Sequence, residues 1–208
     1  MSKLCKQVHT LFSSRQVFQY PFIPSKFPKN GVYVLFEDGE EAHKTKRIVR
    51  VGTHTGNDNL RRRLRNHFMQ NSKDSSIFRK NIGRALLNLE PDPFLAQWEL
   101  DLSTQEAKEK IDLTRLAEVE KLVTEYIQNH FQISVIEVKN KDDRLVLESK
   151  IISTISRCDE CKPSAGWLGS HSPKEKIRES GLWVTNELYK TQLVESDIQK
   201  LKMYSKII

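Results

Sequence analysis

Residues 31–68 read GVYVLFEDGEEAHKTKRIVRVGTHTGNDNLRRRLRNHF. The segments Val32 to Phe36 and Ile48 to Val51 are rich in β-branched and aromatic residues, which are typical of strands. The polar connection between them contains Asp38-Gly39, a pair that favours a turn, and is long enough to form an exposed loop. We therefore expect two antiparallel strands at the start of this stretch.

The second part of the stretch predicts a basic helix. The run Asn57-Asp58-Asn59 supplies residues that commonly begin helices. Leu60, Leu64 and Phe68 then recur at every fourth position, which places them on one apolar stripe. The helix is expected to pack through that stripe and to present its arginines on the remaining faces.

Regular elements are also indicated on both sides of this stretch. Gln132 to Val138 is rich in β-branched residues and predicts a third strand, and Trp98 to Leu102 is a further candidate strand. Helices are expected at residues 4–18, 74–89, 107–130 and 144–156, and the C-terminal part indicates one more strand and helix.

These elements suggest one domain with appendages, as a length of 208 residues also does. Residues 1–30 form an N-terminal helix and a proline-rich lead-in. Residues 31–157 form the main domain, with a helical insertion at about 90–130. Residues 158–208 form a C-terminal extension that packs on the same domain.

The composition favours a polyanionic partner. The chain has 34 Lys and Arg against 27 Asp and Glu, a formal net charge of +7. Each phosphate neutralised by Lys or Arg releases condensed counterions, so this surplus suits nucleic acid, although a merely basic protein has the same composition. No run is apolar enough to cross a bilayer and no signal peptide is evident, so we expect a cytoplasmic protein without a membrane partner.

The three cysteines indicate reduced thiols and not a disulfide framework. Cys158 and Cys161 form a single CxxC pair, and His171 follows downstream. A structural zinc site usually has four ligands. A second pair of ligands is missing unless His171 and a distant group supply it, so a zinc site is not expected.

Arg63 and His67 are four residues apart and therefore project from the same face of the basic helix. A guanidinium is permanently charged and can stabilise the charge that develops when a phosphodiester is attacked. An imidazole can transfer a proton or bind phosphate. The alternative is a solvated basic helix without a catalytic role.

Glu148 interrupts an apolar stripe formed by Leu145, Ile152 and Ile155. A carboxylate at such a position is costly to bury unless a positive group or a hydrogen bond meets it. A divalent cation is one possibility, because Mg²⁺ often uses only one or two protein carboxylates. A salt bridge at the edge of the core is the other.

Tyr33 lies on the first strand of the opening stretch. Alternation places Val32, Val34 and Phe36 on one face and Tyr33 with Leu35 on the other. A phenol near a metal or an arginine can take a proton from water. An aromatic side chain on a half-buried sheet is the more common role of a strand tyrosine.

Three segments in this order, Gly31-Val32-Tyr33, Arg50-Val51-Gly52 and the run from Leu60 to Phe68, resemble the GIY-YIG nuclease domain, and the resemblance extends to about Ser156. It implies an α+β fold with a small three-stranded antiparallel sheet flanked by helices. It also implies cleavage of nucleic-acid phosphodiesters with one divalent metal, here Mg²⁺ or Mn²⁺.

The same resemblance implies roles for individual residues. Tyr33 corresponds to the tyrosine that activates or orients water, and Arg63 and His67 to the arginine and histidine of the helix. Glu148 corresponds to the metal-binding glutamate. The side chains expected to grip flanking phosphates are Arg61, Arg62 and Arg65.

The second motif departs from the family pattern, because Arg50 stands where the family has tyrosine. His54 is a candidate substitute as proton acceptor or phosphate ligand, although a histidine in a surface loop is the simpler interpretation. The late asparagine of the family has two candidate positions, Ser164 and Asn186.

The sequence thus predicts a metal-dependent endonuclease that acts on DNA, more readily double-stranded than single-stranded. A catalytically inactive nucleic-acid-binding module of the same fold is the main alternative. A structural protein that binds a partner through the helix from Ala107 to His130 is a third. Target sequence and oligomeric state are left open.

Overall fold

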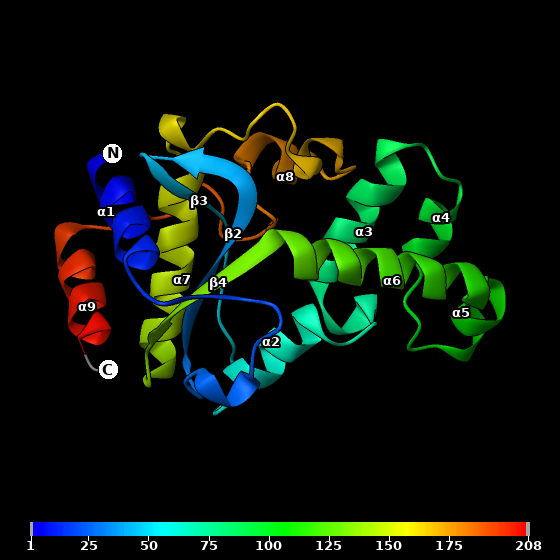
Figure 1. Cartoon of the computed structure of the whole chain (residues 1–208), viewed down its shortest axis with the longest axis horizontal. Coiled ribbons are helices and arrows are strands. Elements are labelled where there is room, and N and C mark those ends of the chain that lie inside the picture. The colour runs from blue at the N-terminus through cyan, green and yellow to red at the C-terminus, as the bar shows by residue number, and fades with distance from the viewer. Residues whose placement is uncertain (1, 207–208) are drawn as a thin grey trace.

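The computed structural model describes residues 2–206. An antiparallel sheet with helices packed against it forms the centre of the molecule. The sheet has four strands in the order β1-β4-β2-β3, all neighbours antiparallel (Figure 1). The α+β class is confirmed, but the sheet has one strand more than expected. The additional strand is only three residues long, too short for a periodic signal. The strands are β1 (Val17–Gln19), β2 (Gly31–Ala42), β3 (Thr45–Gly52) and β4 (Phe131–Glu137).

The turn between β2 and β3 lies further along the chain than expected. His43 and Lys44 form it, both with positive φ (54° and 61°), and Ala42 pairs with Thr45 across it. Asp38-Gly39 instead falls where the register shifts between Phe36 and Glu41, with Gly39 at φ +81°. The expected exposed loop is therefore a bulge inside a longer hairpin.

Helices cover both faces of the sheet, and the alternation of β2 side chains is confirmed. Tyr33 and Leu35 enter one hydrophobic cluster, whereas Val32, Val34 and Phe36 enter the other. Figure 1 shows α1 and α9 side by side next to α7, with α3 and α6 on the opposite side of the strands. The first cluster includes residues of α2 (Leu60–Phe68), α3 (Ile77–Leu89) and α6 (Leu113–His130), and the second includes residues of α1 (Ser2–Ser13), α7 (Lys141–Ser156) and α9 (Glu195–Ser205).

Several helices differ from the prediction in their bounds, and the strand predicted in the C-terminal part is not found among the described residues. The first ends at Ser13 and not at residue 18. The helix expected at 107–130 is divided into α5 (Gln105–Lys110) and α6, because the Asp112 side chain accepts a hydrogen bond from the Arg115 N–H and caps α6. The C-terminal part contains α8 (Glu175–Ser180) and α9, and no strand among the described residues after 157.

The strand expected at Trp98 to Leu102 is wrong, because Trp98 ends the short helix α4 (Phe94–Trp98). Its indole is fully buried against α3, where a Cβ on Gly83 would lie 2.3 Å from the ring. The indole N–H also donates to the Lys80 carbonyl at 3.0 Å. Packing against a helix, and not pairing with a strand, explains this aromatic residue.

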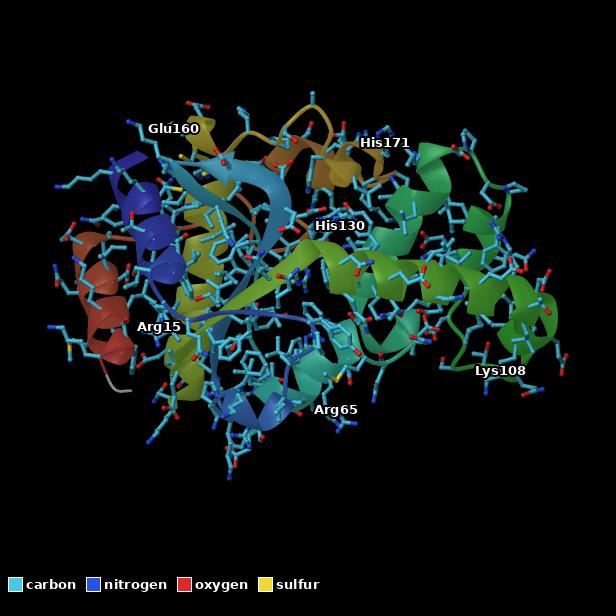
Figure 2. All side chains as sticks on the ribbon, in the orientation of Figure 1. Arg15, Arg65, Lys108, His130, Glu160 and His171 are labelled. Atoms are coloured by element: carbon cyan, nitrogen blue, oxygen red, sulfur yellow. The ribbon has the colours of Figure 1, made fainter. Side chains whose placement is uncertain are left out.

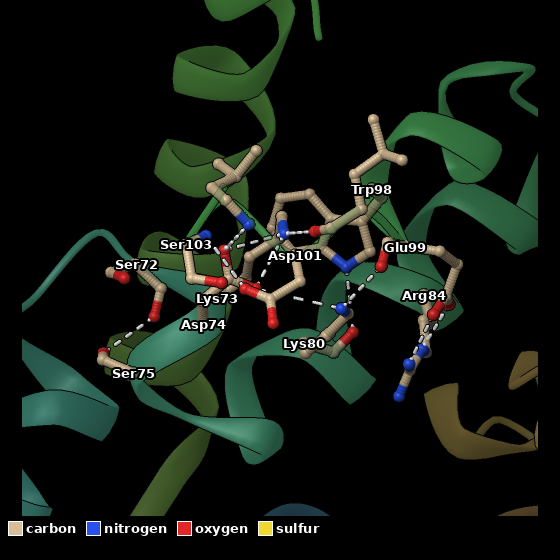
Figure 3. Close-up of polar contacts among 12 residues, drawn as sticks. Ser72, Lys73, Asp74, Ser75, Lys80, Arg84, Trp98, Glu99, Asp101 and Ser103 are labelled. Atoms are coloured by element: carbon tan, nitrogen blue, oxygen red, sulfur yellow. Dashed lines mark hydrogen bonds and ion pairs between the residues drawn. The ribbon is translucent and has the colours of Figure 1, made fainter. Parts of the chain in front are cut away.

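Two buried cations form ion pairs among the helices between β3 and β4, and Figure 3 shows the surroundings of the first, Lys73. Lys73 is 1% exposed, and its ammonium lies 2.9 Å from an Asp74 carboxylate oxygen and 5.9 Å from the Trp98 ring. Arg79, the second, pairs with Glu120 at 2.5 Å between α3 and α6, and both side chains are buried. Removing one partner of a buried pair typically costs about 3–5 kcal/mol, so this contact holds α3 against α6.

Glu37, in the bulge of β2, attaches the C-terminal segment to the sheet. Its carboxylate accepts hydrogen bonds from Tyr126 (2.6 Å) and from the indole N–H groups of Trp167 and Trp183 (both 2.8 Å). Burial raises the pKa of the Glu37 carboxyl, and the three donors oppose that rise. Because Trp183 is held in this way, residues 184–187 lie near Arg50 and Val51 of β3. No described helix combines the length and the apolar character that spanning a bilayer requires.

Candidate active site

A cavity of about 420 Å³ opens between β3, α2, α3, α7 and the segment after Trp183. It brings together Arg63 and Glu148, two of the residues indicated by the sequence. Its walls are otherwise formed by a mixture of apolar and polar side chains. The lining residues are Arg50, Val51, Arg63, Ile77, Asn81, Leu145, Glu148, Ile152, Trp183, Val184, Thr185, Asn186 and Glu187.

Glu148 lies on α7 with its carboxylate at the cavity wall. Its Oε1 accepts a hydrogen bond from the Thr53 N–H at 3.0 Å, and no described residue donates to Oε2. Burial raises the pKa of the Glu148 carboxyl, whereas the charges of Arg50 and Arg63 act in the opposite direction. The carboxylate is thus held by one oxygen and leaves the other for a ligand.

Arg63 and Arg50 supply positive charge from two sides of the same cavity. The Arg63 Nε is buried and has no hydrogen-bond partner among the described residues. Arg50 is 4% exposed, donates from Nη1 to the Trp183 carbonyl and stacks 5.0 Å from the centre of the Phe78 ring. Unused guanidinium donors beside a cavity are suited to an anionic ligand.

Tyr33 lies behind this cavity and does not line it. Its side chain is fully buried, and its hydroxyl lies 2.7 Å from Nε2 of His67. A Cβ on Gly52 would lie 2.3 Å from the Tyr33 hydroxyl oxygen, so the glycine of the second motif allows the close approach of the phenol. The residue after Gly52 is Thr53, which anchors Glu148.

His67 is equally buried and links Tyr33 to Ser76. Its Nδ1 lies 2.7 Å from the Ser76 hydroxyl, which also caps α3 by accepting from the Arg79 N–H. Burial, followed by the nearby arginine charges, lowers the pKa of His67 well below its ordinary value. The imidazole is therefore neutral at pH 7 and can accept from one hydroxyl while it donates to the other.

A second, polar cavity of about 370 Å³ meets the first at Arg63. His54 lines it and is only 5% exposed, so the expectation of a surface histidine is wrong. Its Nδ1 lies 2.6 Å from the Gly56 carbonyl oxygen, and its Nε2 has no partner among the described residues. Burial lowers the pKa of His54. The other lining residues are Thr53, Thr55, Asn59, Arg62, Arg63, Asn66 and Ser75.

The three remaining arginines of α2 differ in their surroundings. Arg62 is exposed and lines the second cavity beside Arg63. Arg61 donates to the carbonyls of Phe27 (2.8 Å) and Ser25 (3.1 Å), on another side of the helix. Arg65 is exposed at the edge of the molecule and lines neither cavity (Figure 2).

Asn186 and Ser164, the two candidate positions for the late asparagine of the family, have different surroundings. Asn186 lies at the rim of the Glu148 cavity, whereas Ser164 donates to the Glu40 carboxylate elsewhere. Sequence reasoning missed Thr185 and Glu187, which line the cavity beside Asn186. They follow α8 in a segment without regular structure, and only the anchoring of Trp183 indicates their position.

A divalent metal fits the first cavity by the chemistry of its donors. The Oε2 of Glu148 is free of hydrogen bonds from described residues, whereas the Glu187 carboxylate, which also lines the cavity, already accepts from the Ser149 hydroxyl and the Lys190 ammonium. Mg²⁺ and Mn²⁺ prefer oxygen ligands and retain several waters, so one or two carboxylates suffice.

Comparison with known proteins gives one positive finding. The family model of the GIY-YIG domain matches residues 3–205, nearly the whole chain. No curated protein and no solved structure gives a significant match. Members of the family are generally endonucleases, so the match indicates a nuclease-type function. Because the match covers far more than half of the sequence, the chain belongs to the GIY-YIG domain family.

Proposed function

We propose that this protein is a metal-dependent endonuclease that hydrolyses phosphodiester bonds of double-stranded DNA in the cavity between α2 and α7. One observation carries the proposal. Arg63 and Glu148, which are far apart in the sequence, line the same cavity. A guanidinium and an acid in one cavity are the two groups that metal-assisted phosphoryl chemistry requires most directly.

Glu148 is the proposed ligand of Mg²⁺ or Mn²⁺. The hydrogen bond from the Thr53 N–H orients the carboxylate and leaves Oε2 for the cation. When bound, the cation polarises the phosphate and eases departure of the leaving oxygen. The role of α7 is to hold this single carboxylate at the wall of the cavity.

Arg63 is proposed to stabilise the negative charge that develops on the attacked phosphate. Its Nε has no partner among the described residues, so the guanidinium keeps hydrogen-bond donors for a phosphate. Arg50 adds a second cation in the place of the missing tyrosine. Because its Nη1 is bound to the Trp183 carbonyl, we assign it to binding and orientation of phosphate.

One side chain is proposed to accept a proton, and two others are proposed to position the site. Tyr33 is fully buried and contacts His67, so in this arrangement both act as positioning residues beneath Gly52 and Thr53. His54 lines a cavity that meets the first at Arg63, and its Nε2 has a free electron pair when Nδ1 carries the proton. We therefore propose His54 as the acceptor of a proton from water.

Binding of DNA is proposed to involve the arginines of α2 together with the positive net charge of +7. Arg62 is placed to contact a phosphate next to the one at Arg63, because both line the second cavity. Arg65 and the partly engaged Arg61 are proposed to contact phosphates further away. Affinity that arises in this way decreases steeply with salt concentration.

A non-cleaving DNA-binding module is the second candidate. The observation that favours it is Arg50, which occupies the position of the second motif tyrosine and leaves no phenol there. Such a module would retain the basic cavity and salt-sensitive binding but would not hydrolyse DNA.

A plasmid-nicking assay separates the two candidates. Purified protein is incubated with supercoiled plasmid in Mg²⁺, in Mn²⁺ and in chelator, beside Arg63→Ala and the control Arg65→Ala on the same helix. We expect metal-dependent nicking by the wild type and by Arg65→Ala, and loss of nicking in Arg63→Ala. Binding by the wild type without nicking in either metal would favour the non-cleaving module.

A further inference from the structure

A cluster of thiol and imidazole groups lies just beyond the C-terminal end of α7, outside the lining of the Glu148 cavity. Cys5 and His9 are one helical turn apart on α1, His43 lies in the β2–β3 turn, and Cys161 lies in a short 3₁₀ helix after α7 (Asp159–Cys161). All four side chains are buried, and one donor atom from each lies within 4.8 Å of the others. Three segments that are distant in the sequence thus meet through metal-binding side chains.

Three separations of the donor atoms are close to those of a tetrahedral site, and all the separations are within 4.8 Å. Zinc bonds of about 2.3 Å to sulfur and about 2.0–2.1 Å to nitrogen place neighbouring ligand atoms about 3.3–3.8 Å apart. In the structure, Cys161 Sγ lies 3.5 Å from Cys5 Sγ, 3.5 Å from His43 Nε2 and 3.9 Å from His9 Nε2. A disulfide would bring the two sulfurs to about 2.05 Å, so this pair is not one.

Cys158 offers a fifth donor to the same cluster. Its Sγ lies 3.4 Å from His43 Nε2. It competes with His9, whose Nδ1 lies 3.0 Å from the Cys5 carbonyl and whose Nε2 accepts from the Ile48 N–H at 3.2 Å. Cys5, His43 and Cys161 therefore belong to either set of four ligands, and the fourth position distinguishes Cys₂His₂ from Cys₃His.

The surroundings of His43 give a second, independent indication. Its Nδ1 lies 3.3 Å from an Oε atom of Glu160 but makes no hydrogen bond with any described residue, so the carboxylate is near the place from which such a group supports a metal-bound histidine. His43 also has a positive φ of 54°, in a two-residue turn where Asn or Gly is preferred. Histidine tolerates this conformation better than most residues, and the turn directs its imidazole into the cluster.

We propose that this cluster is a structural Zn²⁺ site with Cys5, His43 and Cys161 as ligands and either His9 or Cys158 in the fourth position. Thiolates and imidazoles suit Zn²⁺ and not Mg²⁺ or Mn²⁺, so this site is separate from the cation proposed at Glu148. The site holds α1 to the β2–β3 turn and to the segment after α7. His171, the ligand considered from the sequence, lies well away from Glu160 in Figure 2 and does not belong to the cluster. Zinc binding at this cluster does not require endonuclease activity.

Metal content and cobalt spectroscopy test the site on the full chain. Protein purified from zinc-supplemented cells and dialysed should retain about one Zn²⁺ per chain. Replacement by Co²⁺ should give the intense visible bands of a tetrahedral ion together with thiolate-to-metal charge transfer, which grows with the number of thiolates and so separates Cys₂His₂ from Cys₃His. A wild type that holds no zinc and gives no such bands, or that contains a Cys5–Cys161 disulfide, would overturn the proposal.

Variants locate the metal. Cys161→Ser and His43→Ala should lose zinc, whereas the control His171→Ala should keep it. Of His9→Gln and Cys158→Ser, one should keep it and the other should lose it. Zinc retained at full stoichiometry in both Cys161→Ser and His43→Ala would contradict the site. If these variants do not fold, the zinc content and cobalt spectrum of the wild type still decide.

Discussion

The Glu148 cavity and the Cys5–His43–Cys161 cluster contrast within one small fold. The cavity presents oxygen donors and guanidinium groups with unused hydrogen-bonding capacity, and it is open to a ligand of the size of a phosphate. The cluster consists of thiol and imidazole donors, and all four of its side chains are buried. Structural metal sites are closed and catalytic ones keep a position open. The two sites therefore differ as expected for a proposed catalytic ion at Glu148, in the middle of α7, and a proposed structural ion at Cys161, after the end of α7.

Selective removal of metal tests whether the two sites hold distinct ions, and we expect a larger effect from it than from the variants that follow. A brief excess of EDTA should abolish nicking completely, because a cation held by one carboxylate and water exchanges readily. Added Mg²⁺ should restore it. Melting temperature and zinc content should be unchanged by this treatment, as followed by differential scanning fluorimetry and elemental analysis. Unfolding at the same chelator concentration that stops nicking would show that the two ions are not distinct.

The variants His54→Gln and Tyr33→Phe test which of the two side chains has the catalytic role at the Glu148 cavity. His54→Gln should reduce the single-turnover nicking rate about a hundredfold or more, since general-base catalysis contributes about 10²–10⁴. Tyr33→Phe should cost mainly stability, about 1 kcal/mol for one hydrogen bond, with a smaller effect on rate. A variant Tyr33→Phe that is stably folded but inactive, beside an active His54→Gln, would give the phenol the catalytic role.

The buried His67 gives a pH dependence of stability. Its pKa is lowered in the folded state, so below pH 6.5 the unfolded chain binds a proton that the folded chain does not. Stability should therefore fall as the pH decreases from 7 to 5, by at most about 2 kcal/mol from this group. Urea unfolding of His67→Gln should show a weaker pH slope, and the exposed control His130→Ala should keep the wild-type slope. An unchanged slope in His67→Gln would show that other groups set it.

Arg62→Ala and Arg65→Ala give the smallest expected effects. Both remove one exposed arginine of α2, but only Arg62 lines a cavity shared with Arg63. Arg62→Ala should weaken DNA binding several-fold and reduce the slope of log affinity against log salt by about 1, and Arg65→Ala should change both less. Fluorescence anisotropy at several salt concentrations measures both quantities. Equal effects would indicate that DNA covers α2 evenly and is not drawn toward the cavity.

Much of the fold follows from local patterns in the sequence. The strands β2, β3 and β4 and the stripe of Leu60, Leu64 and Phe68 are confirmed, because each pattern matches the periodicity of its element. The His43-Lys44 turn could not be predicted, since Asp38-Gly39 offers the better local turn residues and long-range contacts override them. The segment from Trp98 predicts a strand wrongly, because a short apolar run does not show whether it packs against a helix or pairs in a sheet.

The sites are predictable only in part, for a related reason. Arg63 and Glu148 carry signals in their own helices, an exposed basic face and an acid on an apolar stripe. Cys5 and His43 carry none, because each is a single residue in its segment and only the tertiary fold brings it to Cys161. The zinc site that a lone CxxC could not support in the sequence is therefore indicated once the fold supplies the distant ligands.

The most direct test of the central claim compares wild type with Glu148→Gln in the same nicking assay. Asp142→Asn, in the exposed first turn of the same helix, is the matched control. Loss of a metal ligand should remove several kcal/mol of transition-state stabilisation, which corresponds to a loss of rate of about a hundredfold or more, while DNA binding, zinc content and melting temperature stay at wild-type values. Wild-type nicking by Glu148→Gln in Mg²⁺ would contradict the account.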